Sequence, residues 1–135
     1  MHSERIGFTC SSFDLLHAGH VAMLKESKQN CDFLIVGLNA KPLKNGRPPV
    51  QNLVERWTQL NAVKYVDQII PYDGEDELLD LLKLHNPDVR FIGEDYRNKP
   101  FTGNDLNIEV FYNARHHRFS SAALKKHIRD DNSDS

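Results

Sequence analysis

The feature that most constrains the fold is an unbroken apolar run, FLIVGL, inside residues 32–39. A strand with one face in water alternates apolar and polar residues, whereas this run has an apolar residue or glycine at every position. Such runs are typical of strands that are buried on both faces, as in parallel sheets covered by helices on each side. The run therefore predicts a central strand of an α/β fold.

Strand-like and helix-like segments alternate along the chain. The strand-like segments are residues 5–10, 32–39, 66–72, 88–93 and 107–113, and the helix-like segments are about 20–30, the stretch from 53 onward, 75–85 and 120–128. This alternation predicts a Rossmann-like, doubly wound α/β fold with a parallel five-stranded sheet and helices on both faces. No repeat or long linker interrupts it, so we expect one domain over residues 1–128 and a flexible acidic tail over residues 129–135.

The helix-like segments carry apolar stripes that are expected to face the sheet. In the second of them, apolar residues recur at spacings of four and three, which is the period of one helix face. The residues of this stripe are Leu53, Trp57, Leu60 and Val63. We expect the core to include Trp57, Leu60, Leu78, Leu81 and Leu82.

Composition restricts the kind of protein. Of 135 residues, 39% are hydrophobic and 27% are charged, which is ordinary for a soluble globular domain. The net charge of −2 offers no electrostatic basis for binding nucleic acid, and no apolar run approaches the length needed for membrane insertion. With two cysteines, Cys10 and Cys31, and no apolar leader in MHSERIGFTC, we expect a cytoplasmic protein with reduced thiols.

Between the first strand and the first helix lies FDLLHAGH, residues 13–20, which places two histidines three positions apart. A helix N-terminus presents free backbone N–H groups and the positive end of the helix dipole, so it favours an anion. His17 and His20 on the first turn point the same way, and Gly19 between them lets a bulky group approach the backbone. Together these residues predict a cradle for phosphate oxygens that could stabilise a five-coordinate phosphorus.

Two other interpretations of the histidines are open. Histidines near a helix start can be surface or capping residues. They can also be zinc ligands together with Cys10 or Cys31, although Cys31 lies at the other end of the helix. The position of the motif favours the phosphate interpretation, because ligands of doubly wound sheets bind beyond the carboxyl ends of the strands. The loops at those ends are residues 9–19, 39–52, 93–106 and 113–120.

The segment SFDLLHAGH resembles the signature of the cytidylyltransferase-type nucleotidyltransferases, a superfamily with an H-x-G-H motif after its first strand. The resemblance runs from about residue 6 to residue 128 and is nearest to the glycerol-3-phosphate cytidylyltransferase branch. Three later segments also resemble family segments. They are LVERWTQLNAVKYVDQIIP, with Arg56 and Asp67 in matching positions, FIGEDY, and RHHRFSSAALKKHI, in which Arg115, Ser120 and Ser121 match the closing signature.

By this resemblance the chain would be an enzyme that transfers CMP from CTP to a small phosphorylated alcohol, similar to glycerol 3-phosphate, and releases pyrophosphate. The acceptor phosphate would attack the α-phosphorus in line, so that catalysis rests on positioning and charge stabilisation. Mg²⁺ would accompany the triphosphate. The resemblance also implies a homodimer.

The same resemblance implies the site residues. The catalytic set, which would contact or neutralise the phosphates, comprises His17, His20, Lys44 and Arg115. The nucleotide-binding set comprises Cys10, Ser11, Ser12, Phe13, Asp14, Gly19, Arg56, Asp67, Gly93, Glu94, Asp95, Ser120 and Ser121. No metal bound by protein side chains is expected.

Some of these residues have structural alternatives. In the loop that contains Lys44, either Lys41 or Arg47 could be the phosphate contact instead. Arg56 lies on a helix, where a surface ion pair with a neighbouring carboxylate is an alternative role. Asp67 starts a strand and could serve as a cap or turn residue.

The chain departs from the family pattern at Ser11, where a glycine is usual, at Arg118 and Phe119, which replace Gly-Ile, and at Ala122, which replaces the second threonine. The superfamily also includes adenylyltransferases for heptose phosphates and for flavin synthesis. The segments NGRPPV and GEDYRNKPFTG resemble the heptose branch. The alternatives to a CTP-dependent enzyme are therefore an ATP-dependent adenylyltransferase acting on a sugar phosphate and a nucleotide-binding module without turnover.

Overall fold

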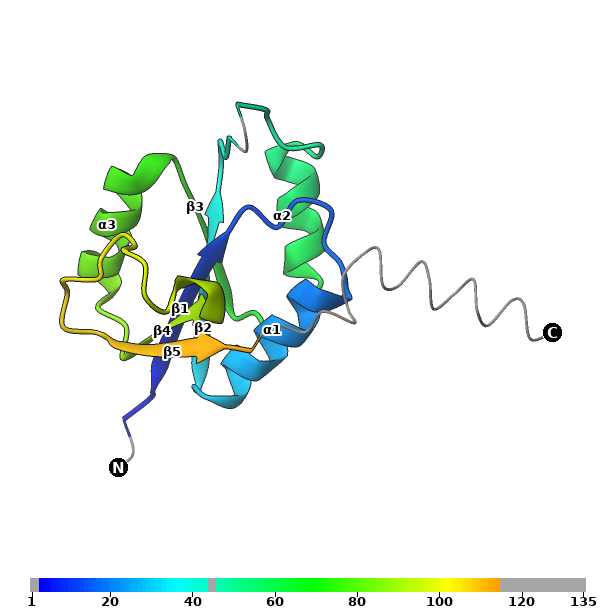
Figure 1. Ribbon diagram of the computed structural model, residues 1–135. Helices are drawn as coiled ribbons and strands as arrows, with labels where there is room; N and C mark the ends of the chain where they lie inside the picture. The colour runs from blue at the N-terminus through cyan, green and yellow to red at the C-terminus, as the bar shows by residue number, and fades with distance from the viewer. Residues whose placement is uncertain (1–2, 44–45, 115–135) are drawn as a thin grey trace.

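The computed structural model describes residues 3–43 and 46–114, and Figure 1 shows its strands in one sheet with helices on both sides. Along the chain the elements are β1 (Ile6–Ser11), α1 (Ala18–Gln29), β2 (Phe33–Asn39), α2 (Leu53–Asn61), β3 (Gln68–Tyr72), α3 (Gly74–His85), β4 (Val89–Gly93), the 3₁₀ helix η1 (Glu94–Tyr96) and β5 (Glu109–Asn113). The strand order is β3-β2-β1-β4-β5, with every pair parallel. The predicted Rossmann-like fold with a five-stranded parallel sheet is confirmed. The predicted helix over 120–128 and tail over 129–135 lie outside the described residues.

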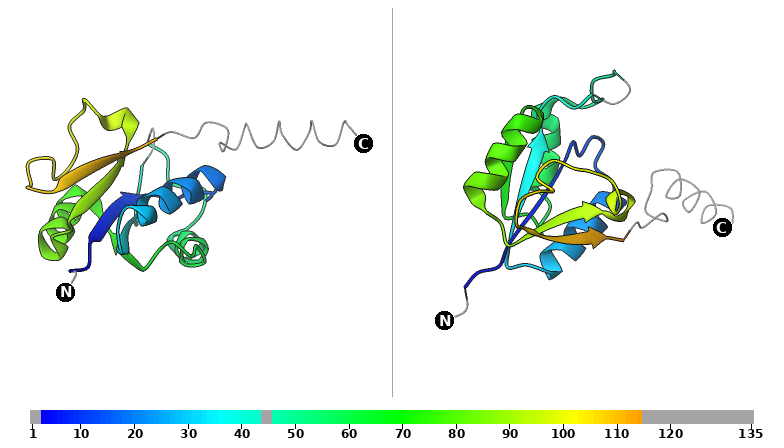
Figure 2. Two further views of the ribbon diagram at one scale, coloured as in Figure 1. Left: turned by 90° about the horizontal axis from the view of Figure 1, so that it is seen from below. Right: turned by 60° about the vertical axis from the view of Figure 1, so that its left-hand side comes forward.

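Helices cover both faces of the sheet (Figure 2), and each face has its own apolar core. On one face Leu24 of α1 and Leu60 of α2 pack against the sheet, and on the other face α3 packs against it. Successive residues of β2 alternate between the cores, because Leu34 and Val36 belong to the first and Ile35 to the second. All three are buried. This explains why the run has no polar position.

The connection order creates a crevice at the centre of the sheet. β1 lies between β2 and β4, and the chain leaves β1 through α1 to reach β2 on one side. It later passes through α3 to β4 on the other side of β1. The loops after β1 and β4 therefore diverge at the carboxyl ends of these strands, where open α/β sheets bind ligands.

The expected core is correct for Leu60, Leu78 and Leu82, which are buried, but wrong for Trp57, of which 40% is exposed. The inward positions of α2 are Arg56 and Leu60, one helical turn apart. Trp57 follows Arg56 and is turned by about 100° from it, toward solvent. A charged residue thus occupies the face that the apolar pattern assigned to tryptophan.

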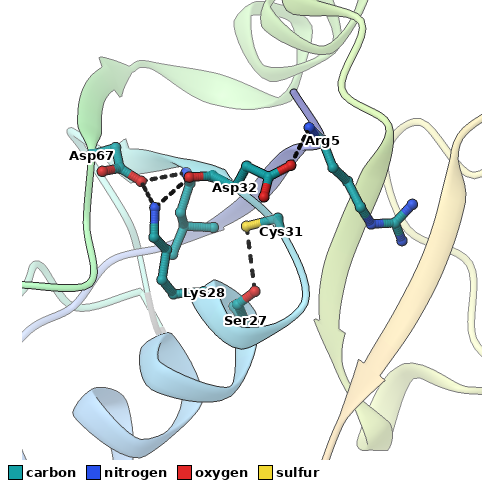
Figure 3. A network of polar contacts seen from close by, with 7 residues as sticks. Arg5, Ser27, Lys28, Cys31, Asp32 and Asp67 are labelled. Atoms are coloured by element: carbon teal, nitrogen blue, oxygen red, sulfur yellow. Dashed lines mark hydrogen bonds and ion pairs between the residues drawn. The ribbon is translucent and has the colours of Figure 1, made fainter. Parts of the chain in front are cut away.

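Polar contacts tie the chain together at the amino-terminal ends of the strands (Figure 3). Lys28 Nζ lies 2.5 Å from Asp67 Oδ2, and the backbone N–H of Leu34 donates to the same oxygen at 2.8 Å. Leu34 is opposite Gly7 in the register of β1 and β2, near the start of both strands. Asp67 therefore joins α1 to β2 and β3 at the end of the sheet opposite the histidines. This corrects the expectation that Asp67 contacts the nucleotide.

Candidate active site

The loop between β1 and α1 has a strained backbone. Phe13 and Leu15 have φ angles of 48° and 52°, in the left-handed region that most residues avoid. Phe13 is 1% exposed and belongs to the core, so burial of its ring offsets the strain. The loop is thereby held in one shape next to the start of α1.

Asp14 fixes this loop to the segment before α2. Its two carboxylate oxygens accept from the backbone N–H groups of Val50, at 2.8 Å, and Gln51, at 2.9 Å. The Gln51 side chain in turn accepts from the N–H of Leu15 at 2.8 Å. Desolvation works against the charge of Asp14, but the N–H groups of Gln51 and Val50 outweigh it and lower the pKa of the carboxyl group. Asp14 therefore orients the site through the backbone.

The two histidines form the N-terminal cap of α1. His17 is the N-cap residue, and its Nδ1 accepts from the N–H of Gly19 at 3.0 Å. His20 Nδ1 accepts from the N–H of His17 at 3.1 Å, which completes a capping box built from imidazoles instead of the usual hydroxyl and carboxylate. Because each Nδ1 is an acceptor, each neutral ring carries its hydrogen on Nε2.

The ring pair is compact and partly buried. The ring centroids of His17 and His20 lie 4.0 Å apart, and those of Phe13 and His20 lie 5.6 Å apart in an edge-to-face arrangement. Burial, followed by the neighbouring His17, lowers the pKa of His20 to about 4. At neutral pH His20 is therefore uncharged and offers a single N–H donor. The capping interpretation and the phosphate interpretation are compatible, since capping uses only Nδ1.

Arg56 connects the loops that surround the histidines. It is 1% exposed, and its guanidinium donates to the backbone carbonyls of Gln51 (3.1 Å), Ser12 (3.0 Å), Asn39 (2.6 Å) and Ala40 (2.9 Å). These carbonyls come from the loop after β1, from the last residue of β2 and the residue after it, and from the segment before α2. Arg56 therefore positions the site, which replaces both its expected contact with nucleotide and the surface ion pair.

A pocket of about 570 Å³ opens beside the histidines and is called the histidine pocket below. Its lining comprises Ser11, Ser12, Asp14, His17, His20, Pro42, Arg47, Pro48 and Pro49. Of the three cations proposed for phosphate contact, Arg47 lines this pocket, whereas Lys41 Nζ lies 3.5 Å from Asp73 Oδ2. Lys44 lies outside the described residues, as do Arg115, Ser120 and Ser121. The departures at Arg118, Phe119 and Ala122 also lie outside them.

A second pocket of about 550 Å³ lies at the carboxyl ends of β1 and β4 and is called the Arg90 pocket. Ser11 belongs to both linings, so the two pockets adjoin. The predicted residues Cys10 and Gly93 line the Arg90 pocket, and the exposed Glu94 and Asp95 follow Gly93 in η1. Sequence reasoning missed Arg90, although a cation inside the apolar strand VRFIG was a usable signal.

The described ranges contain no group of three or more His, Cys, Asp or Glu side chains that could hold a metal ion. A zinc site with Cys31 is contradicted by geometry, because Cys31 Sγ donates to the carbonyl of Ser27 in the last part of α1, far along the helix from its N-cap. Within the same ranges, no helix has the length and apolar character of a membrane span.

A doubly wound sheet with an anion-favouring helix start and two imidazoles at its switch point is typical of nucleotide-handling α/β proteins. A family model described as cytidylyltransferase-like matches residues 8–125, and the chain belongs to this family.

Curated relatives cover most of this chain. The bifunctional protein HldE of Caulobacter vibrioides is 42% identical over 106 residues, which make up 76% of this chain and 22% of that protein. The bifunctional protein HldE of Campylobacter jejuni subsp. jejuni serotype O:6 is 34% identical over 133 residues, which make up 96% of this chain and 29% of that protein. The chain thus spans between 22% and 29% of the length of these two relatives.

Solved structures share the fold. A lipopolysaccharide core biosynthesis protein from Thermoplasma volcanium GSS1 has a TM-score of 0.67 at 26% identity, covering 84% of this chain and 98% of that chain. A pantoate-beta-alanine ligase from Francisella tularensis has a TM-score of 0.61 at 17% identity, covering 93% of this chain and 69% of that chain. The second likeness concerns the fold alone.

Proposed function

We propose that the chain transfers AMP from ATP to the phosphate of a sugar phosphate. An oxygen of the acceptor phosphate attacks the α-phosphorus, the bond from that phosphorus to the oxygen bridging to the β-phosphorus breaks, and pyrophosphate leaves. No covalent enzyme intermediate forms. The protein contributes position and charge stabilisation.

The observation that carries this proposal is the occupation of both imidazole Nδ1 atoms by backbone N–H groups. It leaves the Nε2–H groups of His17 and His20 as donors at the rim of the histidine pocket, beside the N-terminus of α1. Donors held in place before the reaction stabilise charge on the α-phosphate oxygens as the phosphorus becomes five-coordinate. Arg47, exposed at the same pocket, supplies a cation for the leaving pyrophosphate.

The choice of ATP and a sugar phosphate over CTP and glycerol 3-phosphate rests on relatives. The bifunctional proteins HldE are similar over three quarters or more of the chain, which supports the heptose-phosphate alternative derived from NGRPPV and GEDYRNKPFTG. A CTP-dependent enzyme for a phosphorylated alcohol is the second candidate, favoured by the family description.

Mg²⁺ fits this site as a companion of the triphosphate. Both oxygens of Asp14 already accept backbone hydrogen bonds, and the described residues lack a metal-binding cluster, so triphosphate oxygens would provide most of its ligands. Bound Mg²⁺ would neutralise phosphate charge. We also propose that the enzyme is a homodimer, as the family resemblance implies.

The test is pyrophosphate release from each of the four nucleoside triphosphates with Mg²⁺ and a panel of sugar and polyol phosphates. Release that requires ATP and a sugar phosphate supports the proposal, and release that requires CTP and glycerol 3-phosphate supports the second candidate. Binding of nucleotide without release with any acceptor would indicate a module without turnover.

Asparagine variants separate catalysis from capping at the histidines. In His17→Asn and His20→Asn, Oδ1 can replace Nδ1 as the cap acceptor, but the Nε2 donor is lost. We expect each to lower turnover at least about a hundredfold while leaving the melting temperature nearly unchanged. His85→Asn, in the last turn of α3, is the matched control and should keep full turnover. Near-normal turnover in both site variants would refute the mechanism.

A further inference from the structure

The Arg90 pocket has a buried cation in its wall that the transfer mechanism does not use. Arg90 lies on β4, opposite Phe8 of β1, and is 5% exposed. Its pocket adjoins the histidine pocket through Ser11, on the side of the switch point where β4 ends. A ligand in the histidine pocket can therefore extend into the Arg90 pocket.

The charge of Arg90 has no carboxylate partner among the described residues. The ion pairs found there join Arg5 to Glu109, Lys28 to Asp67 and Lys41 to Asp73. A buried charge without a counter-ion is costly, so an anion that enters the pocket gains more than it would at a surface cation.

The hydrogen bonds of Arg90 leave donor capacity unused. Nη1 donates to the carbonyl of Thr102, and within residues 3–43 and 46–114 the only acceptor of Nη2 is the Cys10 sulfur at 3.9 Å, a weak one. The buried Nε has no partner in the described part of the chain. The centroid of the Phe101 ring lies 5.0 Å from the guanidinium carbon of Arg90, within the range of a cation–π contact.

The thiol and the phenol next to Arg90 add no compensating charge. Burial raises the pKa of the Cys10 thiol and, with Cys10 as neighbour, raises the pKa of Tyr72 well above its usual value. Both are therefore neutral at physiological pH. Glu75 also lines the pocket, but it is exposed and accepts from the Thr102 hydroxyl. Arg90 is therefore the buried charge of this wall, and Glu75, an exposed carboxylate of the same lining, can accept from a sugar hydroxyl.

We propose, as an extension of the nucleotidyl transfer proposed above, that the Arg90 pocket binds a second anionic group of the acceptor and that Arg90 determines specificity for it. The acceptor class is a sugar phosphate that carries a further phosphate or a carboxylate remote from the attacking phosphate. The attacking phosphate lies at the histidines, and the sugar ring carries the second anion to Arg90.

Matched acceptors test this directly. One series of acceptors shares the glucose ring and the attacking phosphate and differs in the group at carbon 6: glucose 1-phosphate, glucose 1,6-bisphosphate and glucuronic acid 1-phosphate. A second series uses the mannose ring, with mannose 1-phosphate and mannose 1,6-bisphosphate. We expect kcat/KM for pyrophosphate release to be at least about tenfold higher with a second anion. The bisphosphate and uronate arms identify which anion is preferred. If all acceptors that share one sugar ring gave equal kcat/KM, the proposal would be overturned, while the proposed nucleotidyl transfer would stand.

Variants assign the effect to Arg90. Arg90→Met keeps the length of the side chain and removes its charge, so the difference in kcat/KM between acceptors with and without the second anion should disappear. Arg90→Lys keeps the charge and should retain part of the preference. Lys83→Met, which removes an exposed cation from the last turn of α3, is the charge-matched control and should behave as wild type. A preference that survives in Arg90→Met would overturn the assignment.

A binding measurement keeps this inference separate from the proposed function. Without nucleotide, glucose 1,6-bisphosphate should raise the melting temperature of the full chain more than glucose 1-phosphate does, and the difference should vanish in Arg90→Met. If no acceptor is turned over, the proposed nucleotidyl transfer to sugar phosphates is refuted. The difference in melting temperature between the two sugars still shows whether Arg90 forms an anion site. Equal shifts for the two sugars in the wild-type chain would overturn the site.

Discussion

Replacing Arg56 by methionine tests whether this buried cation holds the active-site loops together. Methionine preserves the aliphatic length but removes all four hydrogen bonds to the carbonyls of Gln51, Ser12, Asn39 and Ala40. A hydrogen bond from a charged donor contributes roughly 1.5–3 kcal/mol, and bonds from one side chain are not additive. Water can reach some of the freed carbonyls. We therefore expect the free energy of unfolding to fall by about 4 kcal/mol.

Urea denaturation measures this loss. The sequence has one tryptophan, and Trp57 is adjacent to Arg56, so its fluorescence reports the unfolding of the segment concerned. Lys25→Met, at an exposed position of α1, is the matched control and should change the free energy by less than about 0.5 kcal/mol. A loss below about 1 kcal/mol in Arg56→Met would contradict the positioning role.

Hydrogen exchange locates the effect. If Arg56 fixes the segment before α2, the amide hydrogens of Val50 and Gln51, which donate to Asp14, should exchange faster in Arg56→Met. Arg56→Lys should give an intermediate loss of stability, because one ammonium group cannot reach carbonyls of separate loops at once. Unchanged exchange at Val50 and Gln51, together with a large global loss, would show that Arg56 supports the core and not the loops.

Three further predictions concern the cap, the loop anchor and the sheet. Folding lowers the pKa of His20 from 6.5 to about 4, so as pH falls the unfolded chain takes up the proton first, and stability present above pH 6.5 is lost toward pH 4. Between pH 7.5 and pH 5, urea denaturation should show that the free energy of unfolding falls by about 2 kcal/mol more in the wild-type chain than in His20→Asn. Equal losses in the two proteins would refute the lowered pKa. Asp14→Asn turns an NH₂ group toward one of the two N–H donors at Val50 and Gln51, so the free energy of unfolding should fall by about 2 kcal/mol in thermal denaturation. An unchanged melting temperature would refute the role of Asp14 as an anchor of the loop. Gly7→Ala places a methyl group 2.5 Å from Phe91 Cε2 and 2.8 Å from Cys31 Sγ, so urea denaturation should show that the free energy of unfolding falls by about 1–3 kcal/mol. An unchanged free energy of unfolding would mean that these two side chains move aside without cost.

Local patterns were sufficient for the architecture. The unbroken apolar run of β2 predicted a strand between two helical layers, and β2 does divide its side chains between two cores. The position of the two histidines after the first strand predicted a helix start at the carboxyl edge, and His17 is the N-cap of α1. These features follow from periodicity and from the unpaired N–H groups of a helix end, which depend on neighbouring residues only.

Roles that depend on distant partners were not predicted. Arg56 and Asp67 both matched family positions, yet Arg56 is turned inward onto four carbonyls and Asp67 lies at the amino end of the sheet beside Lys28. Trp57 has the right spacing for the core but is 40% exposed, because Arg56 takes the inward face of α2. Spacing along a helix gives the angle between side chains, whereas the direction of the whole set depends on what the helix packs against.

The sequence by itself determined the parallel sheet and the helix start, with its two histidines, after the first strand. Tertiary structure alone decided which cations reach the two pockets. Arg47 enters the histidine pocket, and Arg90 lies in a second pocket made from β1, β4 and the loop at Thr102. The physical reason is that burial and charge compensation are set by side chains from segments far apart in the chain, which the order of residues does not bring together until the strands pair.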